Sequence, residues 1–235
     1  MFRDKIGHMV EVYTDDMVVK SKVEKGHIND LKDVFEVLQR HKLHINADKC
    51  AFGVGAGKFL RYMITHRGIE VNPDQIKAVE YLRSPSNPKE VQVLTSMIVA
   101  LNRFISKFAK QFHPFYQLLE KWRGFQWTEE FEKAFQDLKE YLMWAPMLSA
   151  PKPSKDLFMY LLVSKHAISV VLLRDQGVQT LVYYVSKTLV NAETRYLPLE
   201  KLVLALVHAT RKLPHYFQTH SIYVLTEYPL QSLLK

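Results

Sequence analysis

The chain is poor in cysteine and has no long apolar run. Cys50 is the one cysteine among 235 residues, which excludes an internal disulfide and a multi-cysteine metal cluster and agrees with a reducing compartment. No run reaches the roughly 18 apolar residues that span a bilayer, and the first residues lack the apolar stretch of a secretory signal. We therefore expect an intracellular protein, cytoplasmic or nuclear, without a membrane partner.

Acidic residues are outnumbered by basic ones. The sequence has 32 Lys and Arg against 24 Asp and Glu, a formal net charge of +8, and 48% of its residues are hydrophobic. This composition is that of a globular protein with one large or two small cores. Excess positive charge favours polyanionic partners, because neutralising phosphates releases counterions. It indicates nucleic acid, although many basic proteins bind nothing anionic.

Residues 9–20 place two β-rich runs around an aspartate pair. This pattern is typical of a β-hairpin, with Asp15 and Asp16 at its tip. An amphipathic helix is predicted after Gly26, with Asp30 and Asp33 near its positive end. Its inward face comprises Leu31, Val34, Phe35 and Leu38. Residues 51–69 then form an extended stretch interrupted by glycines.

From residue 72 the sequence favours helices. Asn72-Pro73 and Asn87-Pro88 each put a capping side chain before a proline at the first helical position, and Glu90 has the spacing of a capping box with Asn87. A third helix is predicted after Trp127. The tryptophans are expected to pin this helical section to its neighbours; they are Trp122, Trp127 and Trp144. Three prolines within 145–153 predict a linker.

The last third alternates in the order strand, strand, strand, helix, strand. The strands are predicted over 157–164, 168–174, 180–186 and 221–226, and another helix near residue 235. The helix is predicted over 198–213, with an inward face made of Leu199, Leu202, Val203, Leu206 and Val207. The expected fold class is therefore α+β, a mixed α/β arrangement with a mixed sheet.

The aspartate pair suits divalent-metal chemistry. Mg²⁺ prefers carboxylate oxygens and leaves positions open for substrate phosphates, and polymerases use two such ions to activate the attacking oxygen and stabilise the leaving one. Taken alone, however, Tyr13-Thr14-Asp15-Asp16 is a weak signal, because Asp-Asp between strands is more often a solvated turn.

The surrounding sequence makes the signal specific. The stretch Glu11 to Lys22 resembles the catalytic hairpin of gypsy-type long-terminal-repeat retrotransposon reverse transcriptases, especially those of plants. The resemblance continues in order along essentially the whole chain. It is carried by Leu43 to Gly53, Gly57 to Leu60, Arg67 to Pro73, Ala100 to Ile105, Phe125 to Thr128 and Ala134 to Lys139.

The resemblance implies three regions and a metal site. Residues 1–73 are similar to the C-terminal part of a polymerase palm, 74–150 to a helical thumb or connection, and 151–235 to a truncated ribonuclease-H-like domain. Asp15 and Asp16 match two of the three aspartates that bind Mg²⁺ in this family, and the third lies upstream of this chain. Two carboxylates alone are not expected to assemble a two-metal site.

The resemblance also implies nucleic-acid contacts. Tyr13 belongs to the catalytic hairpin, and Phe59 and Leu60 match the segment that supports the primer end. Two positions depart from the family: Arg61 stands where glycine is usual, and Thr14 where a branched aliphatic residue is usual. Threonine is close in shape to valine, so the second departure is expected to be minor.

The ribonuclease-H-like region has lost acidic residues. An active enzyme needs carboxylates on its first strand, first helix and fourth strand. The matching positions here hold Leu162, Leu202 and Glu227, and Glu200 lies half a turn from Leu202. Leucine offers no lone pair to a metal, so we expect no ribonuclease H cleavage and a structural role, as in the tether domains of some plant elements.

Two hypotheses follow. The chain is a fragment of a retrotransposon RNA-directed DNA polymerase, with primer–template RNA and DNA and the rest of the polyprotein as partners. Alternatively, it is a noncatalytic nucleic-acid or protein-binding module derived from the element. Primer extension and the salt dependence of duplex binding distinguish the two.

Overall fold

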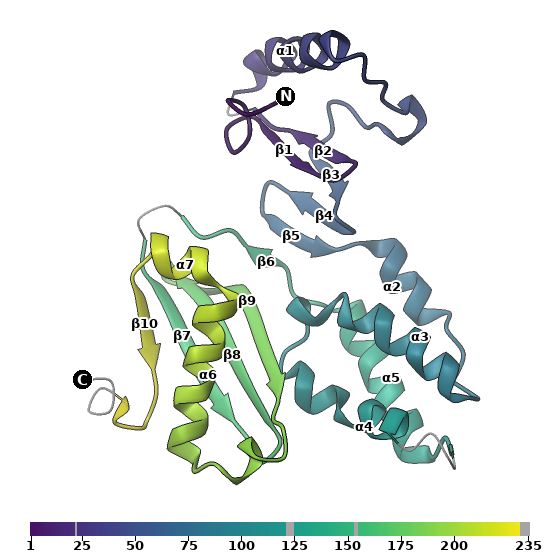
Figure 1. The fold of residues 1–235 in the computed structure, drawn as a ribbon, viewed down its shortest axis with the longest axis vertical. Helices are drawn as coiled ribbons and strands as arrows, with labels where there is room; N and C mark the ends of the chain where they lie inside the picture. Colours follow the sequence, from purple (N-terminus) through teal and green to yellow (C-terminus); the bar gives the residue numbers. More distant parts are fainter. Residues whose placement is uncertain (22, 121–124, 153–154, 231–235) are drawn as a thin grey trace. The chain divides into compact units, whose positions relative to one another are not determined.

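The computed structural model describes residues 1–21, 23–120, 125–152 and 155–230. Its helices and strands follow one another in the order labelled in Figure 1. The chain divides into two compact units, residues 1–66 and 67–235. Both units combine helices with strands, so the expected α+β class is confirmed.

The first unit is built around the β1–β2 hairpin. Strand β1 (Val10–Tyr13) pairs antiparallel with β2 (Asp16–Val19), as predicted. Helix α1 (His27–Arg40) contributes its buried residues to the same small core, which consists of Phe2, Val10, Val34 and Leu38. A second hairpin follows, made of β3 (Ala56–Phe59) and β4 (Tyr62–Thr65).

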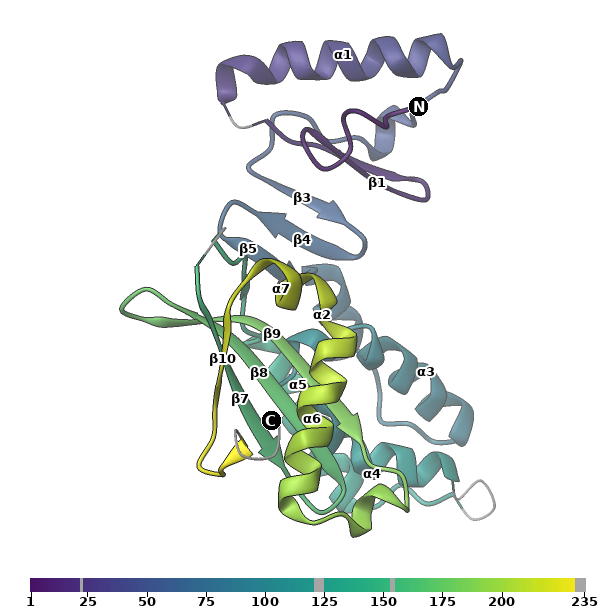
Figure 2. The ribbon, with the colours of Figure 1, turned by 60° about the vertical axis from the view of Figure 1, so that its left-hand side comes forward.

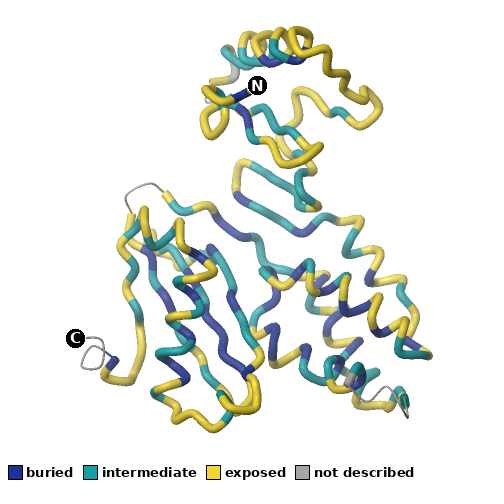
Figure 3. Tube along the Cα trace, viewed as in Figure 1, coloured by how far each residue is buried: buried dark blue, intermediate teal, exposed yellow. Residues whose placement is uncertain are grey.

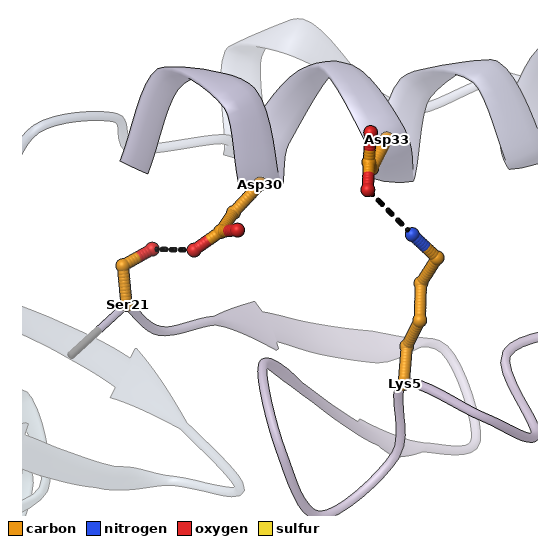
Figure 4. Close-up of polar contacts among 4 residues, drawn as sticks. All are labelled: Lys5, Ser21, Asp30 and Asp33. Carbon is orange, nitrogen blue, oxygen red and sulfur yellow. Dashed lines mark hydrogen bonds and ion pairs between the residues drawn. The ribbon is translucent and has the colours of Figure 1, made fainter. Parts of the chain in front are cut away.

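Two polar contacts fasten α1 to the segments on either side of the first hairpin (Figure 4). Lys5 Nζ donates to Asp33 Oδ2 at 2.9 Å, and Ser21 Oγ donates to Asp30 Oδ2 at 2.6 Å. An exposed ion pair of this kind stabilises a fold by at most about 1 kcal/mol. The contacts therefore orient the helix, while the apolar core supplies most of the stability.

The second unit begins with a strand and a series of helices. Strand β5 (Gly68–Val71) leads to α2 (Pro73–Glu80), α3 (Pro88–Val99), α4 (Phe108–Glu120) and α5 (Glu129–Met143). Both predicted asparagine caps form: Asn72 Oδ1 accepts from the Asp74 N–H, and Asn87 Oδ1 accepts from the Glu90 N–H, each at 3.0 Å. Glu90 Oε2 accepts from the Ser86 N–H at 2.7 Å, so it reaches one residue beyond the usual capping-box partner.

Aromatic rings join α4 to α5. The Trp127 ring lies 6.2 Å from Phe115 and 5.9 Å from Phe135, edge-on to the latter, and both phenylalanines are fully buried. Trp127 thus pins the helical section as expected. Trp144 does not: it follows the last turn of α5 and is 81% exposed. Trp122 lies outside the described residues.

The proline-rich segment is more than the predicted linker. Its strand β6 (Leu148–Ser149) pairs antiparallel with β5, matching Ile69 with Leu148 and Gly68 with Ser149. Gly68 has a φ of +153°, and a Cβ atom there would lie 2.0 Å from the Leu148 carbonyl oxygen. Only glycine allows this close approach.

A mixed sheet forms the C-terminal part of the second unit (Figures 1 and 2). Its order is β10-β7-β8-β9. The strands β7 (Leu157–Val163), β8 (Ala167–Asp175) and β9 (Gln179–Thr188) are antiparallel, and β10 (Ile222–Leu225) is parallel to β7. Helices α6 (Pro198–Lys212) and α7 (Pro214–Thr219) provide the crossover that a parallel pair requires.

Helix α6 packs on the sheet through small residues. Ala205 and Ala209 are fully buried in the core cluster, together with Leu157, Met159 and Ile168. The predicted inward face was wrong in part, because Val207 is exposed whereas the alanines make the contact. The small alanine side chains allow the backbone of α6 to lie close to the strands. Leucines at these positions would hold the helix further from the sheet.

Buried residues are distributed unevenly between the units (Figure 3). In the second unit they run along β7, β8, one face of α6 and the inner sides of α3, α4 and α5, whereas the first unit has the small cluster around Val10 and Val34. Within the described residues, no helix is both long enough and apolar enough to cross a membrane.

Candidate functional site

The aspartate pair lies at the tip of the β1–β2 hairpin. Tyr13, the last residue of β1, pairs with Asp16, the first of β2, so that Thr14 and Asp15 form the two-residue turn. Asp15 and Asp16 are both exposed. Within the described residues, neither carboxylate accepts a hydrogen bond or enters an ion pair. The hairpin therefore presents two adjacent carboxylates whose oxygens are available to a ligand.

Thr14 holds this turn in an unusual backbone conformation. Its φ is +52°, in the left-handed region. A β-branched residue is disfavoured there, at a cost of roughly 1–3 kcal/mol, and such strain concentrates at functional sites. Valine is β-branched like threonine and would bear the same strain at this φ, so the expectation that the departure from the family is minor stays a prediction.

The base of the hairpin is fixed more firmly than its tip. Val10 is fully buried in the core of the first unit. Across the two strands, Lys20 Nζ donates to Glu11 Oε1 at 2.6 Å. Because these contacts lie several residues from the tip, they orient the strands without covering Asp15 and Asp16.

A metal ion at the tip has two protein ligands available. Nowhere in the described part of the chain do three or more His, Cys, Asp or Glu side chains gather in a group that could hold a metal. Mg²⁺ is commonly bound by one or two carboxylates and completes its shell with water and substrate phosphates. The donor set fits a shared, open Mg²⁺ site rather than a closed structural one.

The other expected nucleic-acid contacts lie on the second hairpin of the same unit. Phe59 and Leu60 stand at the end of β3 and in the β3–β4 turn, where Phe59 pairs with Tyr62. Leu60 and Arg61 have φ values of +50° and +69°. Positive φ at both central residues is the requirement of a type I′ turn, which strongly prefers glycine. Arg61 therefore occupies a left-handed position at which glycine is unstrained.

The three ribonuclease-H-like positions lie in different surroundings. Leu162 is 47% exposed and alternates along β7 with the half-buried Leu161 and Val163, which pack against the core, whereas Leu202 is buried within α6. The β7–β10 ladder ends where Tyr160 pairs with Leu225. Leu162 follows two residues later within β7, whereas Glu227 lies in a bend beyond the end of β10.

Glu200 has a structural task of its own. Its Oε2 atom accepts from the Leu197 N–H at 2.8 Å, which caps the first turn of α6. The Glu200 carboxylate, which lies half a turn from Leu202 and is the alternative metal ligand there, thus bonds to the N-terminus of its own helix.

Sequence reasoning missed the role of Lys201. This side chain is buried, and its Nζ donates to the carbonyl oxygens of Thr194 at 3.0 Å, Lys165 at 3.2 Å and Ser164 at 3.4 Å. It ties α6 to the β7–β8 loop and to the segment before the helix. A lysine on a helix normally signals a solvated face, so nothing in the sequence indicated it.

Sequence reasoning also missed Lys107 and Lys110. Both are exposed at the start of α4 and line a shallow concavity together with Leu162, Val163, Ser164, Ala167 and Ser169. Lys110 lies in the first turn of α4, and Lys107 directly precedes the helix with a φ of +51°. Spacing alone could not show which strand they face.

Comparison with known proteins identifies both parts of the chain. A family model described as reverse transcriptase (RNA-dependent DNA polymerase) matches residues 1–98, and one described as an RNase H-like domain found in reverse transcriptase matches residues 127–224. The chain carries a reverse transcriptase segment and a ribonuclease H-like domain. The aspartate hairpin lies within the reverse transcriptase segment, and Leu162 and Leu202 within the ribonuclease H-like domain.

Relatives of this reverse transcriptase segment and its adjoining domain are retrotransposon polyproteins. The Tf2-3 polyprotein of Schizosaccharomyces pombe is 30% identical over 217 residues, and the Tf2-7 polyprotein of the same organism is 29% identical over 217. In each case the match covers 92% of this chain and 16% of the polyprotein. The chain thus spans about one sixth of the length of these curated relatives.

Solved structures share the fold. The foamy viral protease-reverse transcriptase in complex with an RNA/DNA hybrid aligns with a TM-score of 0.83 at 23% identity, covering 95% of this chain and 30% of the viral one. Its complex with double-stranded DNA gives a TM-score of 0.82 at 23% identity, covering 96% and 48%. These alignments confirm the polymerase and ribonuclease-H-like architecture.

Proposed function

We propose that the chain is part of a gypsy-type, plant-like retrotransposon RNA-directed DNA polymerase. In this proposal residues 1–73 complete the palm, 74–150 form the thumb or connection, and 151–235 form a noncatalytic tether. The main support for this proposal is the pair of exposed carboxylates on the Tyr13 to Asp16 hairpin. The segment around it matches a reverse transcriptase model.

Asp15 and Asp16 are the residues that would hold Mg²⁺. When bound, the metal supplies charge neutralisation at the reacting phosphate and activation of the attacking oxygen. The hairpin itself keeps two carboxylates side by side and leaves their oxygens free of protein donors. Because the described residues bring no third acid to them, the site needs a further ligand from the parent polyprotein. We therefore propose that this chain does not extend a primer by itself.

The partners proposed for the parent are a primer–template of RNA and DNA and the rest of the polyprotein. Two observations support them. The similar foamy viral enzyme was solved with an RNA/DNA hybrid and with double-stranded DNA, and the related Tf2 proteins are polyproteins several times longer than this chain. The net charge of +8 favours the same class of ligand.

The ribonuclease-H-like domain is proposed to be catalytically inactive. Leu162 and Leu202 carry no lone pair for a metal, Glu200 caps α6, and Glu227 remains as a single acid beyond the end of β10. Two-metal hydrolysis requires several carboxylates converging on one place. The domain's buried sheet and α6 instead give it the stability of a structural connection.

Primer extension with Mg²⁺ tests the polymerase proposal. This chain is compared with a version extended upstream, in the parent reading frame, to include the missing aspartate. We expect extension from the longer chain alone. In that chain, Asp15→Asn and Asp16→Asn should each reduce extension by roughly 10³-fold or more, because each removes a ligand worth several kcal/mol in the transition state.

The control variant is Asp48→Asn, which removes another exposed carboxylate from the same unit and should retain full extension. Extension by the short chain would contradict the need for a further ligand. No extension by the longer chain would favour the noncatalytic binding module. In that case, a steep fall of duplex affinity with salt would assign it to nucleic acid, and a flat response to protein partners.

A further inference from the structure

A single hydroxyl group joins the end of the first hairpin to two residues of α1. Ser21 lies two residues beyond the end of β2, and its Oγ atom donates to Asp30 Oδ2 at 2.6 Å (Figure 4). The same Oγ atom lies 2.8 Å from Nδ1 of His27, the first residue of α1. All three side chains belong to half-buried residues. We call Ser21, His27 and Asp30 the Ser21 cluster.

The protons available to this cluster determine how the histidine takes part. A hydroxyl group has one proton to donate, and Ser21 gives it to the Asp30 carboxylate. The contact with His27 is therefore a hydrogen bond that its Nδ1–H group donates to Ser21 Oγ. Nδ1 bears a proton both in one neutral tautomer of the ring and in the imidazolium, so either state keeps the cluster joined.

The Asp30 carboxylate is the strongest partner in the cluster. A length of 2.6 Å is that of a charge-assisted O–H···O⁻ bond, which is roughly twice as strong as a neutral one. Asp30 also lies in the first turn of α1, where the helix dipole favours negative charge. Gly26, the N-cap residue, has no side chain to cap the helix. Ser21 thus fastens a helix end that its own N-cap residue leaves without a side-chain bond.

The strand that leads to this cluster carries Asp16 at its other end. Asp16 is the first residue of β2, whereas Met17 and Val19 pack against the core to which α1 contributes. Alternation therefore places the Asp16 carboxylate on the side of the hairpin away from α1. Since a strand advances about 3.3 Å per residue, Ser21 lies at most roughly 17 Å from Asp16 along the chain. The cluster fixes the point at which the chain leaves this strand.

A second contact on α1 provides a comparison. Lys5 Nζ lies 2.9 Å from Asp33 Oδ2, one turn further along the helix, and joins it to the segment before β1 (Figure 4). This ion pair is more exposed than the Ser21 cluster, because more than half of the Asp33 side chain is open to solvent. It fastens α1 without involving the strand that carries Asp16.

We propose that Ser21, His27 and Asp30 are positioning residues, which hold the end of β2 on α1 and so set the place of the Asp16 carboxylate. They act through the strand and do not contact metal or substrate. The catalytic consequence rests on the polymerase function proposed above, whereas the coupling between the cluster and β2 does not. A displacement of about 1 Å in a reacting group can cost roughly 100-fold in rate, so the loss of one hydroxyl group should be measurable.

Hydrogen exchange on the 235-residue chain tests the coupling without catalysis. Ser21→Ala removes the shared hydroxyl group and should speed exchange of the β2 amides by about tenfold or more, because the bond that it breaks involves a charged partner. Ser21→Thr keeps the hydroxyl group and should retain native exchange. Lys5→Met breaks the exposed ion pair and should change β2 exchange little.

The protonation of the His27 ring is a second measurement on the same chain. ¹⁵N NMR at about pH 8 should show a proton on Nδ1. His27→Asn places an amide N–H where Nδ1 stood and should retain native exchange. His27→Gln places it at the position of Nε2 and should resemble Ser21→Ala. A bare Nδ1 would overturn the cluster, since Ser21 would then have to donate to the ring instead of to Asp30.

Primer extension by the upstream-extended chain gives the catalytic readout. Ser21→Ala should lower kcat by about 10–100-fold and raise the Mg²⁺ concentration for half-maximal extension, as the loss of a neighbour that orients a metal ligand does. Affinity for the primer–template should stay native. Ser21→Thr should restore kcat and the Mg²⁺ requirement, and Lys5→Met should leave both unchanged.

The outcomes separate this inference from the proposed function. Native exchange and native kcat in Ser21→Ala would overturn the inference while leaving the polymerase proposal intact. Equal losses in Ser21→Ala and Lys5→Met would also overturn it, because they would assign the effect to a general loosening of α1. If the native extended chain extends no primer, the proposed function fails. Hydrogen exchange then decides the coupling: it is supported if Ser21→Ala alone speeds β2 exchange and overturned if exchange stays native.

Discussion

Tyr13 pairs with Asp16 across a turn whose first residue, Thr14, has a φ of +52°. The two carboxylates of the hairpin are thus displayed by a strained connection of two residues. The strain lies in the turn itself, because the strands on either side are regular. Substituting Thr14 changes the backbone strain of the turn, and substituting Asp15 or Asp16 changes the carboxylates, so the two can be tested separately.

Replacing Thr14 by glycine should stabilise the hairpin by up to about 1 kcal/mol. The gain is the relief of left-handed strain, reduced by the greater freedom of glycine in the unfolded chain. Hydrogen exchange of the β1 and β2 amides should slow accordingly. Thr65→Gly is the control: Thr65 lies in β4 without a positive φ, so its substitution should destabilise. Faster exchange in Thr14→Gly would refute the assignment of strain.

The β3–β4 turn offers a second test of backbone strain. Arg61 has a φ of +69°, and Arg61→Gly should stabilise the second hairpin by about 1 kcal/mol. Lys58→Gly, in the adjoining strand β3, should destabilise it by a similar amount. Exchange of the Ala56 to Thr65 amides reports both. A loss of protection in Arg61→Gly would mean that the arginine side chain holds the turn.

Lys201 should be a stability residue. Lys201→Met keeps the side-chain length but leaves three carbonyl oxygens, of Ser164, Lys165 and Thr194, without their donor. The expected loss is about 1–3 kcal/mol in the free energy of unfolding, read from urea denaturation by tryptophan fluorescence. Lys212→Met, at the exposed end of α6, should change it little. Equal losses would assign the effect to lost charge rather than to the buried hydrogen bonds.

Acid should destabilise the second unit through particular glutamates. The Ser86 backbone N–H holds the pKa of Glu90 below its ordinary value of 4.5, and the Lys187 ammonium group does the same for the pKa of Glu193. A carboxyl with a lowered folded-state pKa contributes stability that is present above 4.5 and lost as the pH falls through the folded value.

Melting temperature measured between pH 6 and 3 checks this. Glu193→Gln should start lower at pH 6 and lose less on acidification than the native chain. Parallel pH profiles for the two proteins would show that the Lys187–Glu193 contact carries no pH dependence.

The sequence predicted best what is local. The Asn72-Pro73 and Asn87-Pro88 starts formed as expected, because a cap and its proline act within one helical turn. Strands β7 to β9 also follow from local apolar or β-branched runs. The hairpin was predictable for the same reason, but the backbone of Thr14 was not, since its conformation depends on the register of the two strands.

Features that depend on distant partners escaped the sequence. Strand β6 forms because Leu148 meets Ile69, about eighty residues earlier, at a place where Gly68 removes a Cβ clash. In α6, the packing face was set by the closeness that Ala205 and Ala209 allow, which a pattern of leucines does not reveal. Lys201 acquired its role in the same way, from carbonyl groups of the β7–β8 loop far along the chain.

One reaction tests the central claim, that a polymerase hairpin is joined to an inactive ribonuclease-H-like domain. The upstream-extended chain, ending at Lys235, is incubated with Mg²⁺, nucleotides and a primer–template whose RNA and DNA strands carry different labels. We predict DNA extension with the RNA strand intact. RNA cleavage that Glu227→Gln or Glu200→Gln abolishes would contradict the claim.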